Sequence, residues 1–479
     1  MNSNHHPLHV IIFPFLAQGH IIPTIDLCKL FASHGVKVTV LTTKGNLSRF
    51  HSPLTRANEL STFLHPIQIS LIPFPSVSGL PENCENMATV PPHLKSLFFD
   101  AVAMLQQPFR AFLKETNPDC VVAGLFLAWI HNVASELNIP SLDFHGSNFS
   151  SKCMSHTVEH HNLLDNSTAE TVLLPNLPHK IEMRRALIPD FRKVAPSVFQ
   201  LLIKQKEAEK LSYGLIINSF YELEPGYVDY FRNVVGRKAW HVGPLLLNDK
   251  NVNTFDRGSK SAIDEASCLS WLGKKSAGSV LYVCFGSASF FTTRQLREIA
   301  VGLEGSGHAF IWVVRDDGDE QWMPEGCEER IEGRGLIIKG WAPQMMILNH
   351  EAVGGYLTHC GWNSSLEGIC VGLPFVTWPL FAEQPYNERL IVDVLKVGVA
   401  VGVKEYSFDP EERTVIEAGS IETAVKKLMG DDEEAEERRR RAKELAAMAR
   451  KAVEEGGSSY ELMSDLIREL EGLRDRRNK

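Results

Sequence analysis

One stretch of this 479-residue chain, residues 341–384, constrains its fold more than any other. It contains an apolar run at 352–357, a turn at 358–364, a helical pattern, and a second apolar run at 374–378. Short apolar runs bounded by turn residues are typical of strands that are buried on both faces of a sheet. The stretch therefore predicts a strand, a tight turn, a helix and the next parallel strand.

The predicted turn carries side chains that suit a diphosphate. A helix N-terminus presents free backbone N–H groups and the positive end of the helix dipole, and both favour an anion. His359, Asn363 and Ser364 lie in this turn or at the start of the helix, and we expect them to donate to the phosphates. This arrangement holds a diphosphate without a metal ion.

Other residues of the stretch suit the rest of a nucleotide sugar. Glu367 lies one helical turn beyond Ser364, where its carboxylate would accept hydrogen bonds from the ribose hydroxyls. Trp341 offers a flat face for a base. Glu383 and Gln384 offer acceptors and donors for sugar hydroxyls. The stretch is therefore predicted to be a nucleotide-sugar site.

The stretch resembles the signature box of the plant secondary-product glycosyltransferases, which are UDP-sugar-dependent enzymes with the GT-B fold. The resemblance covers W-x-P-Q at 341–344, H-C-G-W-N-S at 359–364, the glutamate at 367, G-x-P at 372–374 and the acidic-Gln pair at 383–384. It implies that Ala342, Gln344 and Trp362 also belong to the donor site. It further implies glucose as the sugar, because Gln384 resembles the glucose users of the family, where galactose users tend to carry His.

Composition excludes several other classes of protein. The net charge of −9, without a basic patch that carries aromatic residues, argues against nucleic-acid binding. The nine cysteines are scattered and odd in number, which indicates reduced thiols. The N-terminus has no signal-peptide pattern, and no apolar run approaches the length of a membrane span. We expect a cytoplasmic protein without membrane insertion, and a monomer.

The N-terminal half repeats the alternation of strand and helix. Strands are expected at 9–13, 36–42, 67–72, 119–124, near 141, at 215–218 and at 239–242, and helices at about 22–33, 44–62, 93–114 and 125–137. Residues 160–195 show little periodicity and are expected to be a surface excursion over the acceptor site. Near-continuous apolar strands joined by helices predict a parallel sheet, and ligands bind at the carboxyl ends of such strands.

The second half starts after a polar, aperiodic segment and repeats the same alternation. Strands are expected at 279–285 and 309–314, with a helix at 292–304, and Ser287 lies in the turn that the family uses beside the diphosphate. Two Rossmann-like, doubly wound parallel-sheet domains facing across a cleft are what the GT-B resemblance implies. The expected divisions are an acceptor-binding domain at 1–246, a linker at 247–262, a UDP-sugar-binding domain at 263–457, and a C-terminal helix at 458–479 that packs back on the first domain.

His20 follows the first strand and stands at the predicted ligand edge. A single histidine in this place is by default a helix cap or a core residue, but in the family this loop carries the general base. Phe15, Phe126 and Trp129 are candidates for an apolar acceptor pocket, although each is a core residue by default. His20 is therefore the predicted catalytic base.

Gly124 departs from the family pattern. The family usually has an aspartate directly after this strand, hydrogen-bonded to the catalytic histidine, whereas here the strand ends Val122-Ala123-Gly124. Either another group orients His20, or the acceptor is acidic enough to need less help. Gly124→Asp is expected to restore the carboxylate, unless the glycine instead makes room for a bulky acceptor.

The predicted function is inverting transfer of a hexose, most simply glucose, from a UDP-sugar to a hydroxyl of a flavonoid, another phenolic compound or a triterpenoid. UDP-glucose is then a substrate, and neither a cofactor nor a metal is expected. The D-x-D at 317–319 is interpreted as a surface turn. C-glycosylation of an activated phenolic ring and a non-catalytic nucleotide-sugar-binding protein are the alternatives. A nicotinamide dehydrogenase does not fit, because the turn at 14–20 has a single glycine.

Overall fold

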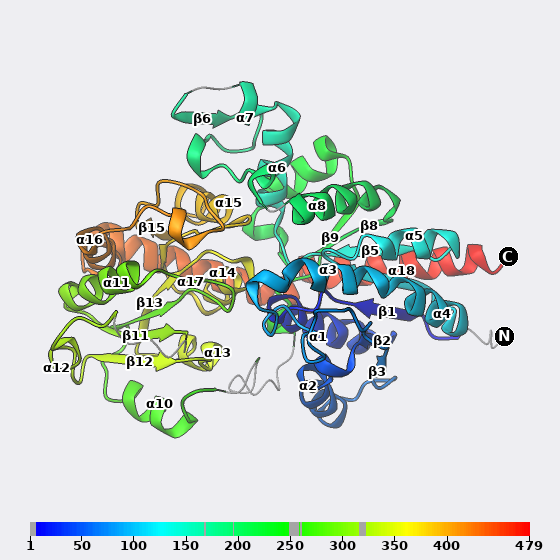
Figure 1. Ribbon diagram of the computed structural model, residues 1–479, viewed down its shortest axis with the longest axis horizontal. Coiled ribbons are helices and arrows are strands. Elements are labelled where there is room, and N and C mark those ends of the chain that lie inside the picture. Colours follow the sequence, from blue (N-terminus) through cyan, green and yellow to red (C-terminus); the bar gives the residue numbers. More distant parts are fainter. Residues whose placement is uncertain (1–5, 167–168, 195, 249–257, 259–260, 316–321) are drawn as a thin grey trace.

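Two parallel sheets, one in each half of the chain, organise the fold (Figure 1). The structure is a computed structural model that describes residues 6–166, 169–194, 196–248, 258, 261–315 and 322–479. The D-x-D at 317–319 and most of the predicted linker at 247–262 lie outside the described residues.

The N-terminal sheet has seven strands in the order β3-β2-β1-β4-β5-β8-β9. Every neighbouring pair is parallel. The strands are β1 (His9–Phe13), β2 (Lys37–Thr42), β3 (Gln68–Leu71), β4 (Cys120–Gly124), β5 (Ser141–Phe144), β8 (Gly214–Ile217) and β9 (Ala239–His241). Helices cover both faces, which explains why the central strands read as nearly continuous apolar runs.

Alternate residues of β1 and β4 enter separate cores on the two faces of this sheet. Val10 and Ile12 pack with α1 (Gln18–Ser33), α2 (Leu47–Leu60) and α18 (Ser458–Arg477). Ile11 and Phe13 pack with α3 (Lys95–Met104), α4 (Gln106–Thr116) and α5 (Trp129–Glu136) on the opposite face, where α8 (Pro196–Ala208) contributes Val198 and Leu201 at the margin. The sheet is therefore the middle of three layers.

Three predicted helix boundaries in this half were wrong. α1 begins at Gln18 rather than near residue 22, so that His20 lies in its first turn. The expected helix at 93–114 is two helices, α3 and α4. The helix expected from residue 125 begins only at Trp129, because Phe126 has a φ of 62° and left-handed backbone interrupts a right-handed helix.

The C-terminal sheet has six parallel strands in the order β12-β11-β10-β13-β14-β15. The strands are β10 (Val280–Cys284), β11 (Ala309–Val314), β12 (Gly335–Lys339), β13 (Val353–Thr358), β14 (Phe375–Thr377) and β15 (Gly398–Ala400). The helices of this half are α10 (Glu265–Leu272), α11 (Thr293–Ser306), α12 (Cys327–Arg330), α13 (Gln344–Leu348), α14 (Trp362–Val371), α15 (Gln384–Arg389), α16 (Ala418–Met429) and α17 (Glu433–Val453). The two sheets make this an α/β protein with two Rossmann-like domains.

Residues 160–195 contain regular structure that the sequence reading missed. After α6 (Phe149–His160) and α7 (Leu163–Asn166), the strands β6 (Thr171–Leu174) and β7 (Ile181–Arg184) form an antiparallel hairpin. Alternate residues of both strands are buried in one core cluster with α6, α9 (Pro225–Tyr230) and Tyr386 of α15. The period-two pattern was present, but each strand is only four residues long.

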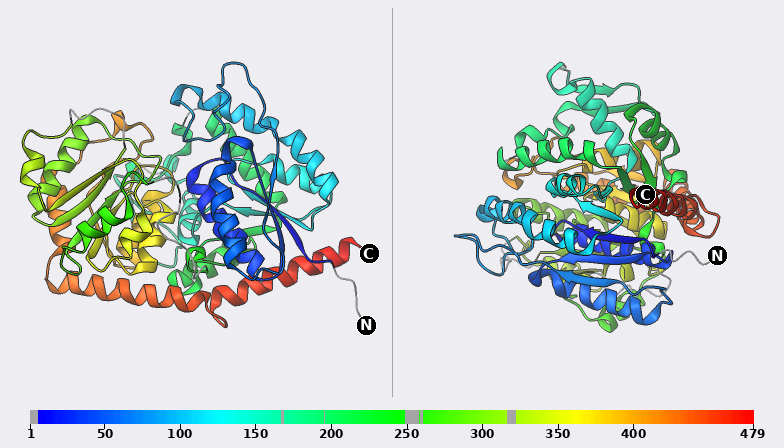
Figure 2. Two further views of the ribbon diagram at one scale, coloured as in Figure 1. Left: turned by 90° about the horizontal axis from the view of Figure 1, so that it is seen from below. Right: turned by 90° about the vertical axis from the view of Figure 1, so that its right-hand side faces the viewer.

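The last two helices run along one side of the molecule from the C-terminal sheet to the N-terminal sheet (Figure 2). Met463, Leu466 and Leu470 of α18 are buried in the same core cluster as β1. Ser459 Oγ donates to the carbonyl of Gly243 at 2.6 Å. The domain boundaries given above stay predictions. Among the described helices, none is both long and apolar enough to cross a membrane.

Candidate functional site

The carboxyl ends of strands from both sheets meet in the middle of the molecule. Asn363, at the start of α14, donates its side-chain N–H to the carbonyl of Gly19, at 2.6 Å. The indole N–H of Trp362 donates to the carbonyl of Asn218, which follows β8, at 2.7 Å. These contacts bring the turn after β13 directly against the turn after β1, which carries His20.

Two glycines make the space in which His359 lies. A Cβ on Gly361 would lie 2.4 Å from Nε2 of His359, and a Cβ on Gly286 would lie 2.7 Å from Cε1 of the same ring. Gly286 follows β10 and has a φ of 76°, and Cys360 has a φ of 63°. The imidazole is therefore held between the turns that end β10 and β13, next to the N-terminus of α14.

Polar atoms at this helix N-terminus have no partner among the described residues. They are Nδ1 of His359 and Oδ1 of Asn363, and both atoms are buried. Burial lowers the pKa of His359 to about 4. Buried polar groups normally find a hydrogen-bond partner, and a helix of ten residues adds its dipole. The helix N-terminus and His359 can therefore receive an anion, whereas the amide oxygen of Asn363 can only accept a hydrogen bond from a donor.

Gln344 links Glu367, the predicted ribose-binding residue, to Ser364, a predicted phosphate-binding residue. Its Nε2 donates to Oε2 of Glu367 at 2.6 Å and lies 3.4 Å from Oγ of Ser364. The hydroxyl of Tyr282 donates to Oε1 of Gln344 at 3.3 Å. Both Ser364 and Glu367 are buried. The structure therefore brings these predicted donor-site residues together and gives the carboxylate a fixed orientation.

Trp341 and Ala342 lie at the segment that leads into α13. The carbonyl of Trp341 accepts from the backbone N–H of Ala262 at 2.7 Å. The indole Nε1 is buried and lacks a partner within the described part of the chain. Ala342 is buried, and its carbonyl accepts from the N–H of Gln344 at 2.8 Å. Trp341 is half-buried, and its stacking on a base stays a prediction.

Two predicted donor-site side chains are already engaged. Trp362 is buried in the core and its N–H is used between the domains, so only its backbone remains at the helix N-terminus. Oε1 of Gln384 accepts from the N–H groups of Leu380 and Phe381, at 2.8 and 2.9 Å. Its side chain therefore fixes the loop after β14, and only the amide N–H groups remain to contact a sugar.

Glu383 and Ser287 complete the predicted donor site. Burial raises the pKa of Glu383, and its Oε1 accepts from Nδ2 of Asn387 at 3.3 Å. Ser287 is exposed just past β10, where its carbonyl accepts from Arg315 at 2.7 Å. Ser287 lies just after β10 and Glu383 just before α15, and their roles in donor binding stay predictions.

His20 is half-buried in the first turn of α1 and packs against an aromatic side chain. The ring of Phe15 meets the imidazole edge to face, with 5.5 Å between the centroids. The hydrogen bonds of His20 to other described residues are all made by its backbone, and its imidazole makes none. Loss of solvent, and secondarily the charge of His145, lowers the pKa of His20 to about 4. The ring is therefore neutral at neutral pH.

Two of the three predicted acceptor residues belong to one aromatic cluster beside His20. Phe15 and Phe126 lie 5.1 Å apart, and Phe99 lies 6.0 and 5.6 Å from them. Trp129 instead packs edge to face on the buried ring of Phe109, at 5.3 Å. Phe15 therefore adjoins the predicted base directly and Phe126 lies behind Phe15, while Trp129 packs on a core ring; the acceptor-binding roles of the three residues stay predictions.

Gly124 leaves no room for a side chain. A Cβ there would lie 2.4 Å from the backbone N of Phe15 and 2.9 Å from the carbonyl carbon of Pro14. Both are main-chain atoms, so they cannot move aside as the end of a side chain can. The expectation that Gly124→Asp restores a carboxylate beside His20 is therefore wrong, since strand β4 packs directly against the turn after β1.

A buried charged network lies beside this region, and the sequence reading missed it. Asp143 of β5 accepts from Nε2 of His131 at 2.8 Å, and its Oδ1 lies 3.2 Å from Nε2 of His145. Glu209 and Arg237 complete the network. An aspartate inside a strand that is otherwise buried was the available signal, because a buried carboxylate requires partners.

Asp143, His145 and Glu209 also have the spacing of a metal site, with their ligand atoms within 4.8 Å of one another. The guanidinium of Arg237 lies 2.8 Å from Oε2 of Glu209 and 3.4 Å from Oδ2 of Asp143. Arg237 already gives both carboxylates a cationic partner, so we assign no metal to this network.

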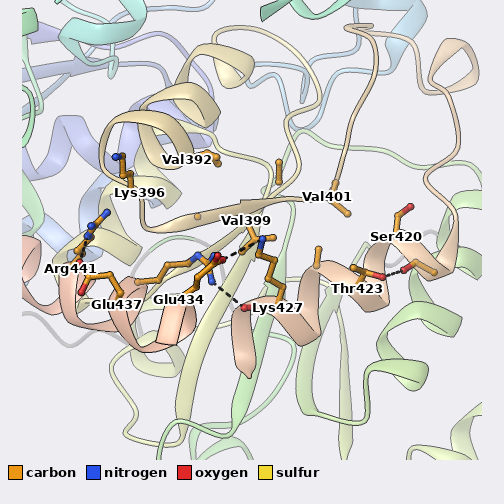
Figure 3. Close-up of a pocket in the computed structure, with 15 residues that line it drawn as sticks. Val392, Lys396, Val399, Val401, Ser420, Thr423, Lys427, Glu434, Glu437 and Arg441 are labelled. Carbon is orange, nitrogen blue, oxygen red and sulfur yellow. Dashed lines mark hydrogen bonds and ion pairs between the residues drawn. The ribbon is translucent and has the colours of Figure 1, made fainter. Parts of the chain in front are cut away.

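A separate groove lies at the outer edge of the C-terminal sheet (Figure 3). It is lined by β15, α16 and α17, and its basic residues include Lys427, Arg438 and Arg441. These side chains pair with Glu434 and Glu437. The groove is on an edge strand rather than at strand carboxyl ends, so it is not the candidate site.

Comparison with known proteins shows the family. The family described as "UDP-glucoronosyl and UDP-glucosyl transferase" matches residues 235–436, and the family "Glycosyltransferase, N-terminal domain" matches residues 6–247. The chain is 45% identical to scopoletin glucosyltransferase of Nicotiana tabacum, over 97% of this chain and 98% of the relative. It is 46% identical to anthocyanin 3'-O-beta-glucosyltransferase of Gentiana triflora, with the same coverage.

Two solved structures resemble this one over nearly the whole length of the chain. Glycyrrhiza uralensis UGT73P12, in complex with glycyrrhetinic acid 3-O-monoglucuronide, superposes with a TM-score of 0.92 at 38% identity, covering 98% of this chain and 97% of that one. Medicago truncatula UGT71G1, in complex with UDP-glucose, gives a TM-score of 0.78 at 27% identity, covering 97% and 98%. The arrangement of the two sheets is therefore common to this chain and to enzymes that bind UDP-sugars.

Proposed function

Because this chain belongs to the UDP-glucoronosyl and UDP-glucosyl transferase family, and is a UDP-dependent glycosyltransferase, we propose that it transfers glucose from UDP-glucose to a hydroxyl of a small apolar acceptor, with inversion and with His20 as general base. One contact carries the proposal. The hydrogen bond from Asn363 to Gly19 fixes the N-terminus of α14 against the residue before His20. The phosphate-binding turn and the base therefore share one site.

The donor would be held by the groups around α14. The diphosphate lies at the helix N-terminus, with His359, Asn363 and Ser364 donating, and Glu367 takes the ribose hydroxyls while Gln344 holds it in place. Trp341 stacks on the uracil. Several of these side chains have buried atoms with unused hydrogen-bonding capacity, and this observation supports a polar ligand.

In the reaction, a new bond forms between the acceptor oxygen and the anomeric carbon, while the bond from that carbon to the UDP oxygen breaks. His20 takes the hydroxyl proton, and UDP departs with the electron pair. Donors preorganised where charge develops stabilise the leaving group, and here they are the α14 N-terminus and its side chains. A neutral imidazole is the form that can accept a proton, and the low pKa of His20 supplies it.

Phenolic compounds are the acceptor class that we favour. Phe15, Phe99 and Phe126 form an aromatic cluster beside His20, and aromatic rings stack well on flat acceptors. The names of similar enzymes mention scopoletin and anthocyanin, and one similar structure holds a triterpenoid glucuronide. We extend this range of phenolic and triterpenoid acceptors to the present chain. Its placement in the cytoplasm and a monomeric state are part of the proposal.

Incubation with UDP-glucose and a panel of coumarins, flavonoids, triterpenoids and simple phenols, followed by mass spectrometry, tests the function. We expect a gain of one hexose on at least one phenol, with retention of activity in EDTA. His20→Gln should remove about 10²- to 10⁴-fold of the rate, the usual contribution of a general base, while His51→Gln on the exposed face of α2 should not.

Three results would contradict all or part of the proposal. UDP binding without transfer to any acceptor would instead indicate a non-catalytic nucleotide-sugar-binding protein. A hexose that resists acid hydrolysis would indicate a bond to carbon, and hence C-glycosylation of a phenolic ring. Full activity in His20→Gln would remove the base assignment while leaving the transferase function intact.

A further inference from the structure

A buried pair of asparagines joins the two halves of the molecule close to the candidate donor site. The side-chain N–H of Asn148, which precedes α6, donates to Oδ1 of Asn387 on α15 at 2.7 Å. The two residues are 239 positions apart in sequence, and both are fully buried. Helix α6 follows β5 of the N-terminal sheet, α15 follows β14 of the C-terminal sheet, and the two helices lie side by side (Figure 1). The pair is therefore a contact between the two domains.

The N-cap of α6 determines which atom of each amide is the donor. Oδ1 of Asn148 accepts from the backbone N–H of Ser151 at 2.7 Å and from the hydroxyl of Ser150 at 3.0 Å. A backbone N–H can only donate, so this atom of Asn148 must be the oxygen, and its NH₂ group must face Asn387. Asn387 therefore presents its oxygen to Asn148 and directs its own two N–H bonds elsewhere.

The two N–H bonds of Asn387 reach the candidate donor site. Its Nδ2 donates to the carbonyl of Cys360 at 2.8 Å and to Oε1 of Glu383 at 3.3 Å. Cys360 directly follows His359 and has a φ of 63°. Left-handed backbone is uncommon for a residue with a side chain, so this turn needs bonds that hold it. The first backbone bond of α14 runs to the carbonyl of Gly361, so the carbonyl of Cys360 lies before the helix and takes its bond from Asn387.

Glu383 lies against the same turn. Burial, the largest influence, raises the pKa of this carboxyl. The N–H groups of its own backbone, of Asn387 and of Trp362, together with the charge of Lys152, act in the opposite direction. Trp362 is the first residue of α14, so the carboxylate is close to the N-terminus of that helix. One nitrogen of Asn387 therefore holds both the turn and a carboxylate beside it.

We propose that Asn387 is a positioning residue that ties the turn after β13 and the carboxylate of Glu383 to the N-terminus of α6, so that the contact between the two domains sets the geometry of the donor site. A buried amide that loses a partner leaves a polar atom without water, and it turns or moves to find another one. A change at Asn148 should therefore reach the turn, although Asn148 is not itself predicted to contact the donor. The part that concerns Glu383 and the sugar rests on the proposed function.

The N-terminal domain contains a second asparagine pair with the same chemistry, which supplies a matched control. Nδ2 of Asn86 donates to Oδ1 of Asn46 at 2.7 Å, and Oδ1 of Asn86 accepts from the backbone N–H of Ala88 at 3.0 Å. Nδ2 of Asn46 donates to Oγ of Thr43 at 2.9 Å and to the carbonyl of Glu85 at 2.7 Å. Both asparagines are buried. All these partners belong to the N-terminal domain, so this pair makes no link to the donor site.

Asn148→Asp tests the link through UDP binding. Aspartate is a good N-cap and keeps an oxygen for Ser151, but when ionised it has no hydrogen to donate to Asn387. The amide of Asn387 must then turn its N–H bonds away from Cys360 or lose its partner. We expect the dissociation constant of UDP, measured by calorimetry, to rise about tenfold, the effect of one lost hydrogen bond. Asn86→Asp should also lower the Tm but leave the dissociation constant unchanged.

A double-substitution cycle distinguishes a link from two independent effects. Asn387→Ala removes the N–H bonds to the donor site and should weaken UDP binding at least as much as Asn148→Asp does. In the variant with both substitutions the loss should be no larger than in Asn387→Ala alone, because the link is already broken. Asn148→Ser, which also caps a helix and carries no charge, takes the place of Asn148→Asp if that variant does not fold.

The role of Glu383 is tested by the ratio of the dissociation constants of UDP-glucose and UDP. This ratio should rise in Asn387→Ala, because Glu383 loses a bond that orients it, whereas Asn86→Asp should keep the ratio of the parent. An unchanged ratio in Asn387→Ala would overturn the part of the proposal that concerns the sugar.

The link itself would be overturned by any of three results: parent-like UDP affinity in Asn148→Asp, an equal loss of affinity in Asn86→Asp, or additive losses in the double variant. Failure of the parent to transfer glucose to any acceptor would instead refute the proposed function. Calorimetry with UDP would still decide whether Asn387 positions the turn.

Discussion

The side-chain amide of Asn363 donates a hydrogen bond of 2.6 Å to the carbonyl of Gly19. Asn363 lies in the first turn of α14, the helix predicted to hold the diphosphate, and Gly19 directly precedes the predicted base. The two residues are 344 positions apart in sequence. This polar contact, together with the hydrogen bond from Trp362 to Asn218, holds the predicted donor site against the turn that carries the predicted base.

Asn363→Ala should reduce kcat more than it weakens UDP binding. The substitution removes the contact to Gly19 together with one phosphate donor, and a net hydrogen bond is worth about 0.5–1.5 kcal/mol, or up to about tenfold. Calorimetry with UDP and steady-state kinetics separate the two effects. Equal kcat in the parent and the variant would mean that the contact does not align the reacting groups.

Gly361→Ala should weaken UDP binding without removing any functional group. The added Cβ would lie 2.4 Å from Nε2 of His359, so the imidazole must move. Loss of a charge-assisted hydrogen bond costs about 1.5–3 kcal/mol, so the dissociation constant should rise by about tenfold or more. His359→Ala should give a similar value.

Gly419→Ala is the matched control for this substitution, because nothing lies within 4 Å of the Cβ that it would add. Calorimetry measures the dissociation constant of UDP for Gly361→Ala, His359→Ala and Gly419→Ala. Parent-like UDP affinity in Gly361→Ala would show that the position of His359 does not matter for the diphosphate.

Most of the fold was predictable because the buried strands carry their pattern locally. β1 and β11 have the predicted limits, and β4 begins one residue later. The errors have local physical causes. Phe126 adopts a positive φ, which cannot be predicted from its residue type. The strands β6 and β7 are too short to give a clear period-two pattern.

The candidate donor site could be predicted because nearly all of its residues lie in one stretch of the sequence, from Trp341 to Gln384. The network around His145 was not, since its five residues come from four separate segments that only the folded chain brings together. Sequence reasoning also failed at Gly124. The sequence shows that residue 124 has no carboxylate, but only the structure shows that main-chain atoms fill the space that a side chain at this position would need.

Gly124→Asp and Gly124→Ala should both destabilise the protein. Each adds a Cβ that would meet the backbone of Phe15 at 2.4 Å, and overpacking in a core costs about 1–3 kcal/mol. Gly472→Ala on α18 is the control, because its Cβ meets nothing within 4 Å. Thermal unfolding measures the effect. A parent-like Tm for the Asp variant, with higher activity on alcohols, would revive the idea of a restored carboxylate.

Gln384→His should shift the sugar preference towards UDP-galactose while lowering kcat/KM for both donors. The loss follows because Oε1 of Gln384 accepts from the N–H groups of Leu380 and Phe381, so that this loop loses two hydrogen bonds. Each is worth about 0.5–1.5 kcal/mol. Gln384→Glu keeps an oxygen that can accept from both N–H groups and loses only the amide N–H groups of the side chain. Competition between the two donors measures the preference, and an unaltered donor ratio in both variants would mean that residue 384 does not contact the sugar.

Acid should destabilise the folded chain through its buried histidines. Burial, as the largest cause, lowers the pKa values of His9, His20, His241 and His359 to about 4, from an ordinary value of 6.5. Between these values the unfolded chain binds protons that the folded chain does not, so the free energy of unfolding falls as pH drops from about 6.5 towards 4. Above this range the four residues make no pH-dependent contribution.

UDP-glucose should offset part of this loss. Its diphosphate would lie against His359 and favour the protonated ring, so the pKa of His359 should rise when the donor binds. The gain in Tm from a fixed, saturating concentration of UDP-glucose should therefore be larger at pH 5.5 than at pH 7.5. In His359→Gln the gain should become nearly independent of pH, whereas His51→Gln should behave as the parent. A gain that is equal at the two pH values in the parent would place the diphosphate away from His359.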